Sequence, residues 1–117
     1  MLITIDPAGD APVFAQIADQ VRTQLADGRI PAGTRLPAAR DLADQLDISL
    51  HTVLHAYQSL RDEGLIALRR GSGAVAVGPD QDLAIVRAAV AAVVREAKRH
   101  DLALPTLTAL IREEYGR

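Results

Sequence analysis

The stretch from residue 65 to residue 77 restricts the fold of this chain more than any other. Residues 65–68 are apolar, residues 69–73 read Arg-Arg-Gly-Ser-Gly, and residues 74–77 are apolar again. Two short apolar runs on either side of a glycine-bearing loop predict a β-hairpin. The glycines permit a close approach to another backbone, and the two arginines place positive charge at the tip of the hairpin.

Three helices are predicted ahead of this hairpin. The first begins at Pro12, in a position that proline tolerates, and ends before Gly28. Its apolar residues recur every three or four positions and are Phe14, Ile17, Ala18, Val21 and Leu25. A turn-rich connection leads to a second helix over about residues 38–46. Ser49 is a suitable N-cap for a third helix, which Gly64 ends.

The short turn Asp47-Ile48 between the second and third helices is typical of a helix-turn-helix. Helical periodicity alone fits a generic three-helix bundle equally well. A hairpin that directly follows the third helix occupies the position of a wing, and this favours the winged arrangement. We therefore expect a mainly α fold with a small β-hairpin, in which a winged helix-turn-helix is followed by two C-terminal helices. Its DNA-binding domain would cover residues 1–78.

A second region is predicted after Gly78-Pro79, over residues 79–117. It holds a long helix over about residues 80–100 and a last helix that starts at Pro105-Thr106, with Leu107, Leu110, Ile111 and Tyr115 inward. The valine-rich stripe of the long helix is wider than one small domain needs, so we expect a homodimer interface; packing against the first helix is the alternative. The interface residues would be Leu83, Val86, Val90, Val93, Val94, Leu107, Leu110 and Ile111.

Composition excludes several other functions. The chain has no cysteine, and no carboxylate lies between the paired histidines His51 and His55, so we expect neither disulfides nor a metal site. No nucleophile with a base and no phosphate-binding loop is found, so we expect neither an enzyme nor a cofactor. The N-terminus lacks a basic segment followed by an apolar run, and the apolar stretch 83–94 is too short to cross a bilayer. These features predict a soluble cytoplasmic protein.

Charge placement matters more than net charge for DNA binding. The chain carries a formal charge of −2, and residues 1–78 hold seven arginines against nine acidic residues. Binding must therefore come from a focused arginine patch.

A recognition helix reads bases with its N-terminal residues, and those candidates are Ser49, Leu50, His51, Thr52 and His55. For Ser49 we expect a capping role as well, and for His55 a solvated or dimer-facing side chain is the alternative. The wing candidates are Arg69, Arg70, Gly71, Ser72 and Gly73.

An ordered set of short motifs between Pro12 and Gly73 resembles the GntR family of regulators. The matching pieces are Pro12-Val13-Phe14, Gln16-Ile17, Gly28, Gly33, Leu36-Pro37-Ala38-Ala39-Arg40-Asp41-Leu42-Ala43, Ile48-Ser49, Thr52-Val53, Ala56-Tyr57, Leu60, Glu63-Gly64-Leu65-Ile66 and Gly71-Ser72-Gly73. The resemblance implies a winged helix that binds a palindromic DNA operator as a homodimer, and repression rather than activation. Because only residues 80–117 follow, the chain is similar to the short YtrA-type subfamily, whose C-terminal helices mainly dimerise.

The resemblance also implies roles for two arginines. Arg40 stands where matching family arginines contact the operator, and an ion pair with Asp44 at i, i+4 is the alternative. Arg35 lies just before it, within reach of phosphate.

Several residues depart from the family pattern. Ala38 replaces a common serine, and Leu50, His51 and Leu54 stand where basic or polar residues are frequent. The usual base-reading arginine is absent, so the resemblance implies no particular operator sequence. Two leucines on this face leave a second hypothesis open, a winged helix that binds protein instead of DNA. The sequence also leaves open an unknown small-molecule effector at the interdomain or dimer interface.

Overall fold

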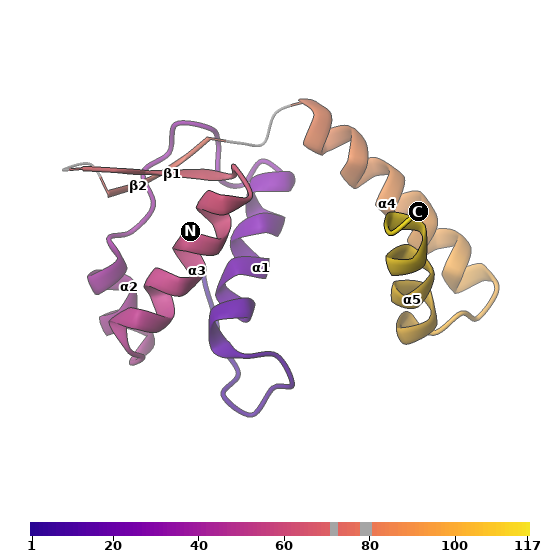
Figure 1. The fold of residues 1–117 in the computed structure, drawn as a ribbon, viewed down its shortest axis with the longest axis horizontal. Coiled ribbons are helices and arrows are strands. Elements are labelled where there is room, and N and C mark those ends of the chain that lie inside the picture. Colours follow the sequence, from indigo (N-terminus) through magenta and orange to yellow (C-terminus); the bar gives the residue numbers. More distant parts are fainter. Residues whose placement is uncertain (71–72, 78–80) are drawn as a thin grey trace. The chain divides into compact units, whose positions relative to one another are not determined.

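The computed structural model describes residues 1–70, 73–77 and 81–117, with side chains described for all of these except residues 81–83. The chain forms two compact units, residues 1–84 and 85–117. The elements are α1 (Val13–Ala26), α2 (Ala39–Leu46), α3 (Leu50–Asp62), β1 (Ile66–Arg69), β2 (Gly73–Ala76), α4 (Gln81–Arg99) and α5 (Leu104–Tyr115) (Figure 1). The predicted fold class, a winged helix-turn-helix followed by two helices, is confirmed. The predicted boundary at Gly78-Pro79 lies outside the described residues.

The core of the N-terminal unit is aliphatic and lies among its three helices. Helix α3 packs against both α1 and α2, and the wing covers the end of α3 (Figure 1). The side chains at the centre of the core, fully buried, are Ile17, Val21, Leu25, Val53, Tyr57 and Leu60. Burial of each aliphatic side chain contributes about 1.5–3 kcal/mol to the free energy of folding. This unit therefore has a core of its own. The Tyr57 hydroxyl donates a hydrogen bond to the carbonyl of Pro37 (2.7 Å), which ties α3 to the residue that precedes α2.

The wing contains one more paired segment than the sequence predicted. Strands β1 and β2 pair antiparallel from Ile66 opposite Ala76 to Arg69 opposite Gly73. The connection 33–36 pairs with the other edge of β2. The Leu36 amide donates to the Ala74 carbonyl (2.9 Å), and the Ala76 amide donates to the Thr34 carbonyl (2.8 Å). The wing is therefore bonded through its backbone to the connection that leads into α2.

Three helices end with the same pair of backbone hydrogen bonds. After α2, the amide of Ile48 donates to Ala43 and that of Asp47 donates to Asp44 (3.0 and 3.3 Å). The same pattern follows α3 at Gly64 and α4 at Asp101. This arrangement requires a left-handed residue, which glycine adopts without strain; the φ angles are 55° at both aspartates and 80° at Gly64. The tight turn between α2 and α3 thus rests on a strained aspartate.

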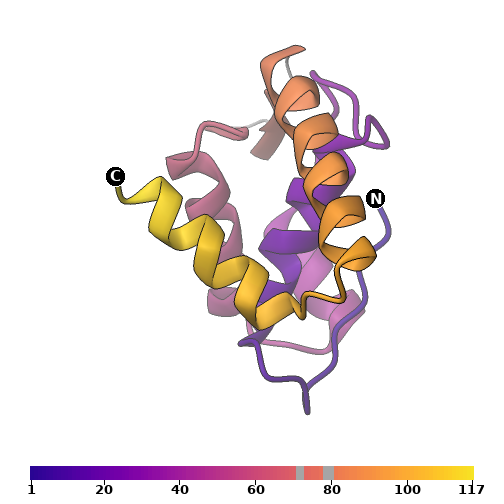
Figure 2. The same cartoon turned by 90° about the vertical axis from the view of Figure 1, so that its right-hand side faces the viewer.

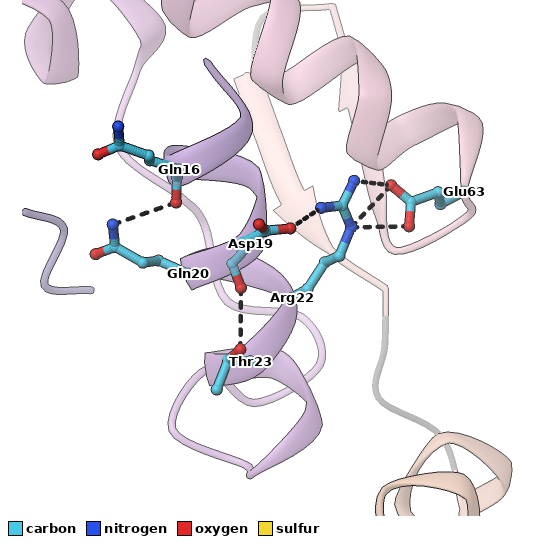
Figure 3. A network of polar contacts seen from close by, with 6 residues as sticks. All are labelled: Gln16, Asp19, Gln20, Arg22, Thr23 and Glu63. Atoms are coloured by element: carbon cyan, nitrogen blue, oxygen red, sulfur yellow. Dashed lines mark hydrogen bonds and ion pairs between the residues drawn. The ribbon is translucent and has the colours of Figure 1, made fainter. Parts of the chain in front are cut away.

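Three glutamines of α1 hold the extended N-terminal segment. Gln16 accepts a hydrogen bond from the Asp6 amide (2.7 Å), Gln20 accepts one from the Thr4 amide (2.9 Å), and Gln24 donates to the Leu2 carbonyl (2.7 Å). Figure 3 shows Gln16 and Gln20 one after the other along α1. The contacts join every fourth residue of α1 to every second residue of the extended segment. Four residues of a helix rise about 6.0 Å and two residues of an extended chain about 6.6 Å, so the two spacings match. The alternating run of residues 2–5 predicts a minor edge strand or a tail; the structure assigns no strand there, and these side-chain hydrogen bonds hold the segment.

The C-terminal unit has little core of its own. Helices α4 and α5 diverge from the turn that connects them (Figure 2), and Ala97 and Leu107 are its buried side chains among those described. The prediction that Leu110, Ile111 and Tyr115 point inward is wrong for this chain, because they are 51%, 48% and 92% exposed. A helix with one neighbouring helix can bury only one narrow face. No helix in the described part of the chain has the length and apolar character needed to span a bilayer.

Candidate nucleic-acid interface

The arginines of the N-terminal unit fall into two groups. Arg22, Arg29 and Arg61 each form an ion pair with a carboxylate. The other four are exposed, and among the described residues they form no ion pair; they are Arg35, Arg40, Arg69 and Arg70. These four are the arginines that the sequence assigned to DNA contacts. The alternative ion pair between Arg40 and Asp44 is not formed within the described residues.

The paired arginines serve structural purposes. Arg22 of α1 makes a bidentate contact with Glu63 at the end of α3 (2.5 and 2.9 Å) and a further contact with Asp19 (Figure 3). The hydrogen bonds that Arg22 donates to the Glu63 carboxylate raise the pKa of the guanidinium above its usual value. Arg29 and Arg61 pair with Asp27 and Asp62 close by in the sequence. Four of the nine acidic residues within residues 1–78 are therefore engaged with arginines that are not candidates for DNA contact.

The N-terminus of α3 is capped as predicted. The Ser49 hydroxyl accepts a hydrogen bond from the Thr52 amide (3.2 Å), and the two hydroxyls lie 2.9 Å apart. Ser49 is exposed, while Thr52 is half-buried. Capping fixes the direction of the helix start and leaves the exposed serine hydroxyl beside a positive helix terminus. Such a terminus favours an approaching phosphate.

The outer face of α3 is occupied by a histidine with leucines beside it. His51 is exposed, and Leu50 and Leu54, one helical turn apart, are both half-buried. The buried residues Val53 and Tyr57 follow Leu50 at i+3 and i+7, so the two leucines lie at the edge of the buried face and His51 faces outward. Two of the residues predicted to read bases, Leu50 and His51, therefore reach the surface at the start of α3.

His55 has a partner that the sequence did not predict. Its ring stacks on that of Phe14 in α1, with centroids 3.7 Å apart and planes 15° apart, although the side chain remains exposed. The contact joins residues distant in the sequence, and no local periodicity signals such a pair. His55 thus helps to fix α3 against α1, which neither the predicted DNA contact nor its alternative anticipated.

The wing places its arginines on one small sheet. Arg69 ends β1 opposite Gly73, Arg70 follows it, and Arg35 forms a bridge with Val75 on the other edge of β2. Directly opposite residues in antiparallel pairs share a face, so Arg35 lies on the face away from the buried Ala74 and Ala76. Gly73 adopts a φ of 71°, a conformation suited to glycine. The candidates Gly71 and Ser72 lie outside the described residues.

The exposed groups of the N-terminal unit suit electrostatic binding. Within the residues that the structure describes, no three histidine, cysteine or acidic side chains gather as a set of metal ligands. Exposed guanidinium groups, a capped helix start and a glycine-bearing wing are groups that contact a phosphate backbone.

The sequence comparisons agree with one another. Residues 14–75 match the profile of bacterial regulatory proteins of the gntR family. The chain is 36% identical over 72 residues to the HTH-type transcriptional repressor YtrA of Bacillus subtilis, covering 62% of this chain and 55% of YtrA. It spans from 15% to 55% of the lengths of curated relatives such as the regulatory protein MocR of Rhizobium meliloti and YtrA.

Solved structures show the same fold. YtrA of Sulfolobus acidocaldarius, a GntR-family transcription factor, is 30% identical with a TM-score of 0.62, over 81% of this chain and 99% of that one. The AraR DNA-binding domain in complex with operator ORX1 has a TM-score of 0.56 at 23% identity, over 64% and 93% of the two chains. The relatives are regulators, in agreement with the prediction that the chain is not an enzyme. The profile match, the YtrA structure and the winged helix together establish that this chain belongs to the gntR family of bacterial regulatory proteins.

Proposed function

We propose that this chain is a transcription regulator that binds operator DNA as a homodimer and represses transcription. The observation that carries the proposal is the set of four exposed arginines without acidic partners among the described residues. They lie on α2, on the connection before it and on the wing. The operator complex of AraR, which has the same fold, supports DNA as the partner.

Each group in the proposal has a distinct role. Helix α3 enters the major groove with Ser49, Leu50 and His51 leading. Arg35, Arg40 and the wing arginines contact phosphates on either side, which positions the helix but does not select bases. We assign DNA binding to residues 1–78 and dimerisation to residues 79–117. Operator binding places the protein with the chromosome in the cytoplasm.

A second copy of the chain is the partner that suits the C-terminal unit. Its described apolar side chains that remain at least partly exposed include Ile85, Val86, Val90, Val93, Val94, Leu110 and Ile111. An apolar groove of about 410 Å³, lined mainly by Ala92, Val93, Ala97, Leu102 and Leu107, lies open between α4 and α5. An exposed apolar surface of this extent on so small a unit favours association. A symmetric dimer presents two α3 helices to a palindromic operator. The side chain of Leu83, also predicted at this interface, lies outside the described residues.

Repression is supported by the relatives. YtrA and NagR of Bacillus subtilis are both transcriptional repressors. A bound dimer blocks access to the DNA that it covers, which needs no further domain. A small-molecule effector is not required by this proposal.

The test is selection of DNA from a random double-stranded pool by the full chain, followed by affinity measurements on the selected sequence. Arg40→Ala should weaken binding by about 100-fold, because each of the two protomers loses a charge-assisted phosphate contact of about 1.5 kcal/mol. The slope of log affinity against log salt should also become shallower by about 1.8 for a dimer that loses two phosphate contacts.

Arg61→Ala is the matched control, since Arg61 is also exposed in the N-terminal unit but is paired with Asp62. It should change affinity less than twofold. A pool with no enriched sequence, or an affinity independent of salt, would overturn the proposal and favour a protein-binding winged helix.

A further inference from the structure

The first two turns of α3 carry no lysine, arginine, aspartate or glutamate. Residues 50–57 read Leu-His-Thr-Val-Leu-His-Ala-Tyr. Thr52 shares its hydroxyl with the Ser49 cap, and the ring of His55 is stacked on Phe14. Val53, Ala56 and Tyr57 are buried in the core. The groups left for base recognition are therefore His51 and the exposed parts of Leu50 and Leu54.

Leucine can recognise only one feature of the major groove. Base edges there present hydrogen-bond donors and acceptors, and the one apolar group is the C5-methyl of thymine. A leucine placed against a polar edge would strip water from that edge and return no hydrogen bond, which is unfavourable. Against a methyl group, the same leucine removes apolar surface from water on both sides.

The spacing of the two leucines fits neighbouring base pairs. Residues at i and i+4 of a helix lie about 5–6 Å apart. Base pairs rise about 3.4 Å along each strand, so this separation spans one to two base steps. Exposed arginines on α2 and the wing supply the charge that holds such a helix against DNA, and an apolar protein partner would gain nothing from them.

We propose that Leu50 and Leu54 are specificity-determining residues that recognise the C5-methyl groups of two thymines, one to two base pairs apart, in each operator half-site. This inference rests on the proposed function. With leucines in these positions, operator recognition depends on thymine methyl groups. An arginine in the same place would instead select guanine through its guanidinium group.

The experiment uses the selected DNA and removes one methyl group at a time. Each thymine of the half-site is replaced singly by deoxyuridine, which lacks only the C5-methyl. The full chain should lose about fourfold in affinity at two neighbouring thymines, the value of one buried methyl group. Leu50→Ala should abolish the difference between thymine and deoxyuridine at one of these positions, and Leu54→Ala at the other.

Leu104→Ala is the matched control, because Leu104 is an exposed leucine of α5. It should retain both differences in full. The ratio of two affinities is measured within one protein preparation, so a partly unfolded variant does not distort it. If a variant fails to fold, the wild-type comparison of thymine with deoxyuridine still decides the case.

The outcomes separate the inference from the proposed function. Wild-type binding that is indifferent to every deoxyuridine, or discrimination that survives in both leucine variants, overturns the assignment of the leucines and leaves DNA binding intact. Failure to select any sequence overturns the proposed function itself, and this inference with it.

Discussion

The two compact units differ in what their apolar side chains pack against. In residues 1–84, side chains from α1, α2, α3 and the wing share one continuous core. In residues 85–117, two helices bury Ala97 and Leu107 and, in the described part of that unit, leave valines, isoleucines and leucines exposed. The first unit can fold on its own contacts, whereas a helix pair of this size cannot bury enough surface without a partner. The stability of each unit therefore has a different source.

The largest effect is expected from a leucine in the core of the first unit. Leu60→Ala should lower the free energy of unfolding by about 2–5 kcal/mol, because it removes a fully buried side chain and leaves a cavity. Leu104→Ala, at a side chain that is 69% exposed, should change it by less than about 0.5 kcal/mol. Urea unfolding followed by circular dichroism measures both. Equal effects would mean that the two units are stabilised in the same way.

A charge on the exposed face of α4 should separate the copies. Val90→Lys should weaken self-association about 100-fold, or about 3 kcal/mol, because it buries an unpaired charge in the proposed interface. Sedimentation velocity measures the change. Ala88→Lys adds the same charge two residues away on α4, on another face of the helix, and should leave the dimer intact. If the Val90 variant stays dimeric, another surface forms the dimer.

A smaller effect should follow from removing the hydroxyl of Tyr57. Tyr57→Phe should cost about 1 kcal/mol of unfolding free energy through loss of the hydrogen bond to Pro37. Burial also raises the pKa of Tyr57 above its usual value of about 10. Folding therefore favours the protonated phenol, so its contribution is complete below about pH 10 and declines as the pH rises further.

Tyr57→Phe should lose this part of the destabilisation at alkaline pH. Unfolding curves between about pH 9 and pH 11 measure it as the change of the unfolding free energy with pH. An identical pH dependence in the two proteins would show that Tyr57 titrates equally in the folded and unfolded chains.

The smallest effects are expected at the two left-handed aspartates, one in each unit. Asp47→Gly should stabilise the first unit by about 0.5 kcal/mol, because glycine adopts a positive φ without steric strain. Asp101→Gly, in the turn between α4 and α5, should act on the second unit and should therefore raise the stability of the dimer. Thermal unfolding at several protein concentrations distinguishes the two: only the second gain should depend on concentration.

Most of the fold could be predicted because its signals are local. Helical periodicity, the Ser49 cap, and glycines after helices all act within a few residues, and the predicted helices and hairpin are present. The four arginines that the sequence assigned to DNA contacts are exposed, and among the described residues they form no ion pair. Their contacts with DNA stay a prediction.

The features that the sequence did not predict are contacts between distant segments. The stack of Phe14 on His55 and the pairing of residues 33–36 with β2 depend on how elements pack. The glutamine contacts of α1 had a visible signal, since residues 16, 20 and 24 are all glutamine at a spacing of four. Polar residues on a helix usually face solvent, so that spacing by itself does not predict a bound segment. The prediction of an inward face on α5 failed because apolar periodicity identifies an apolar face but does not say which chain covers it.

The pairing of residues 33–36 with β2 has a consequence for motion. The amides of Leu36 and Ala76 take part in one ladder, so they should exchange with solvent deuterium through the same opening event. The hairpin cannot swing away without breaking the backbone bonds of the segment that enters α2. We therefore expect Arg35 and Arg69, which come from opposite sides of the helix-turn-helix in the chain, to move together. A displacement at the wing is transmitted to the start of α2 through the backbone alone.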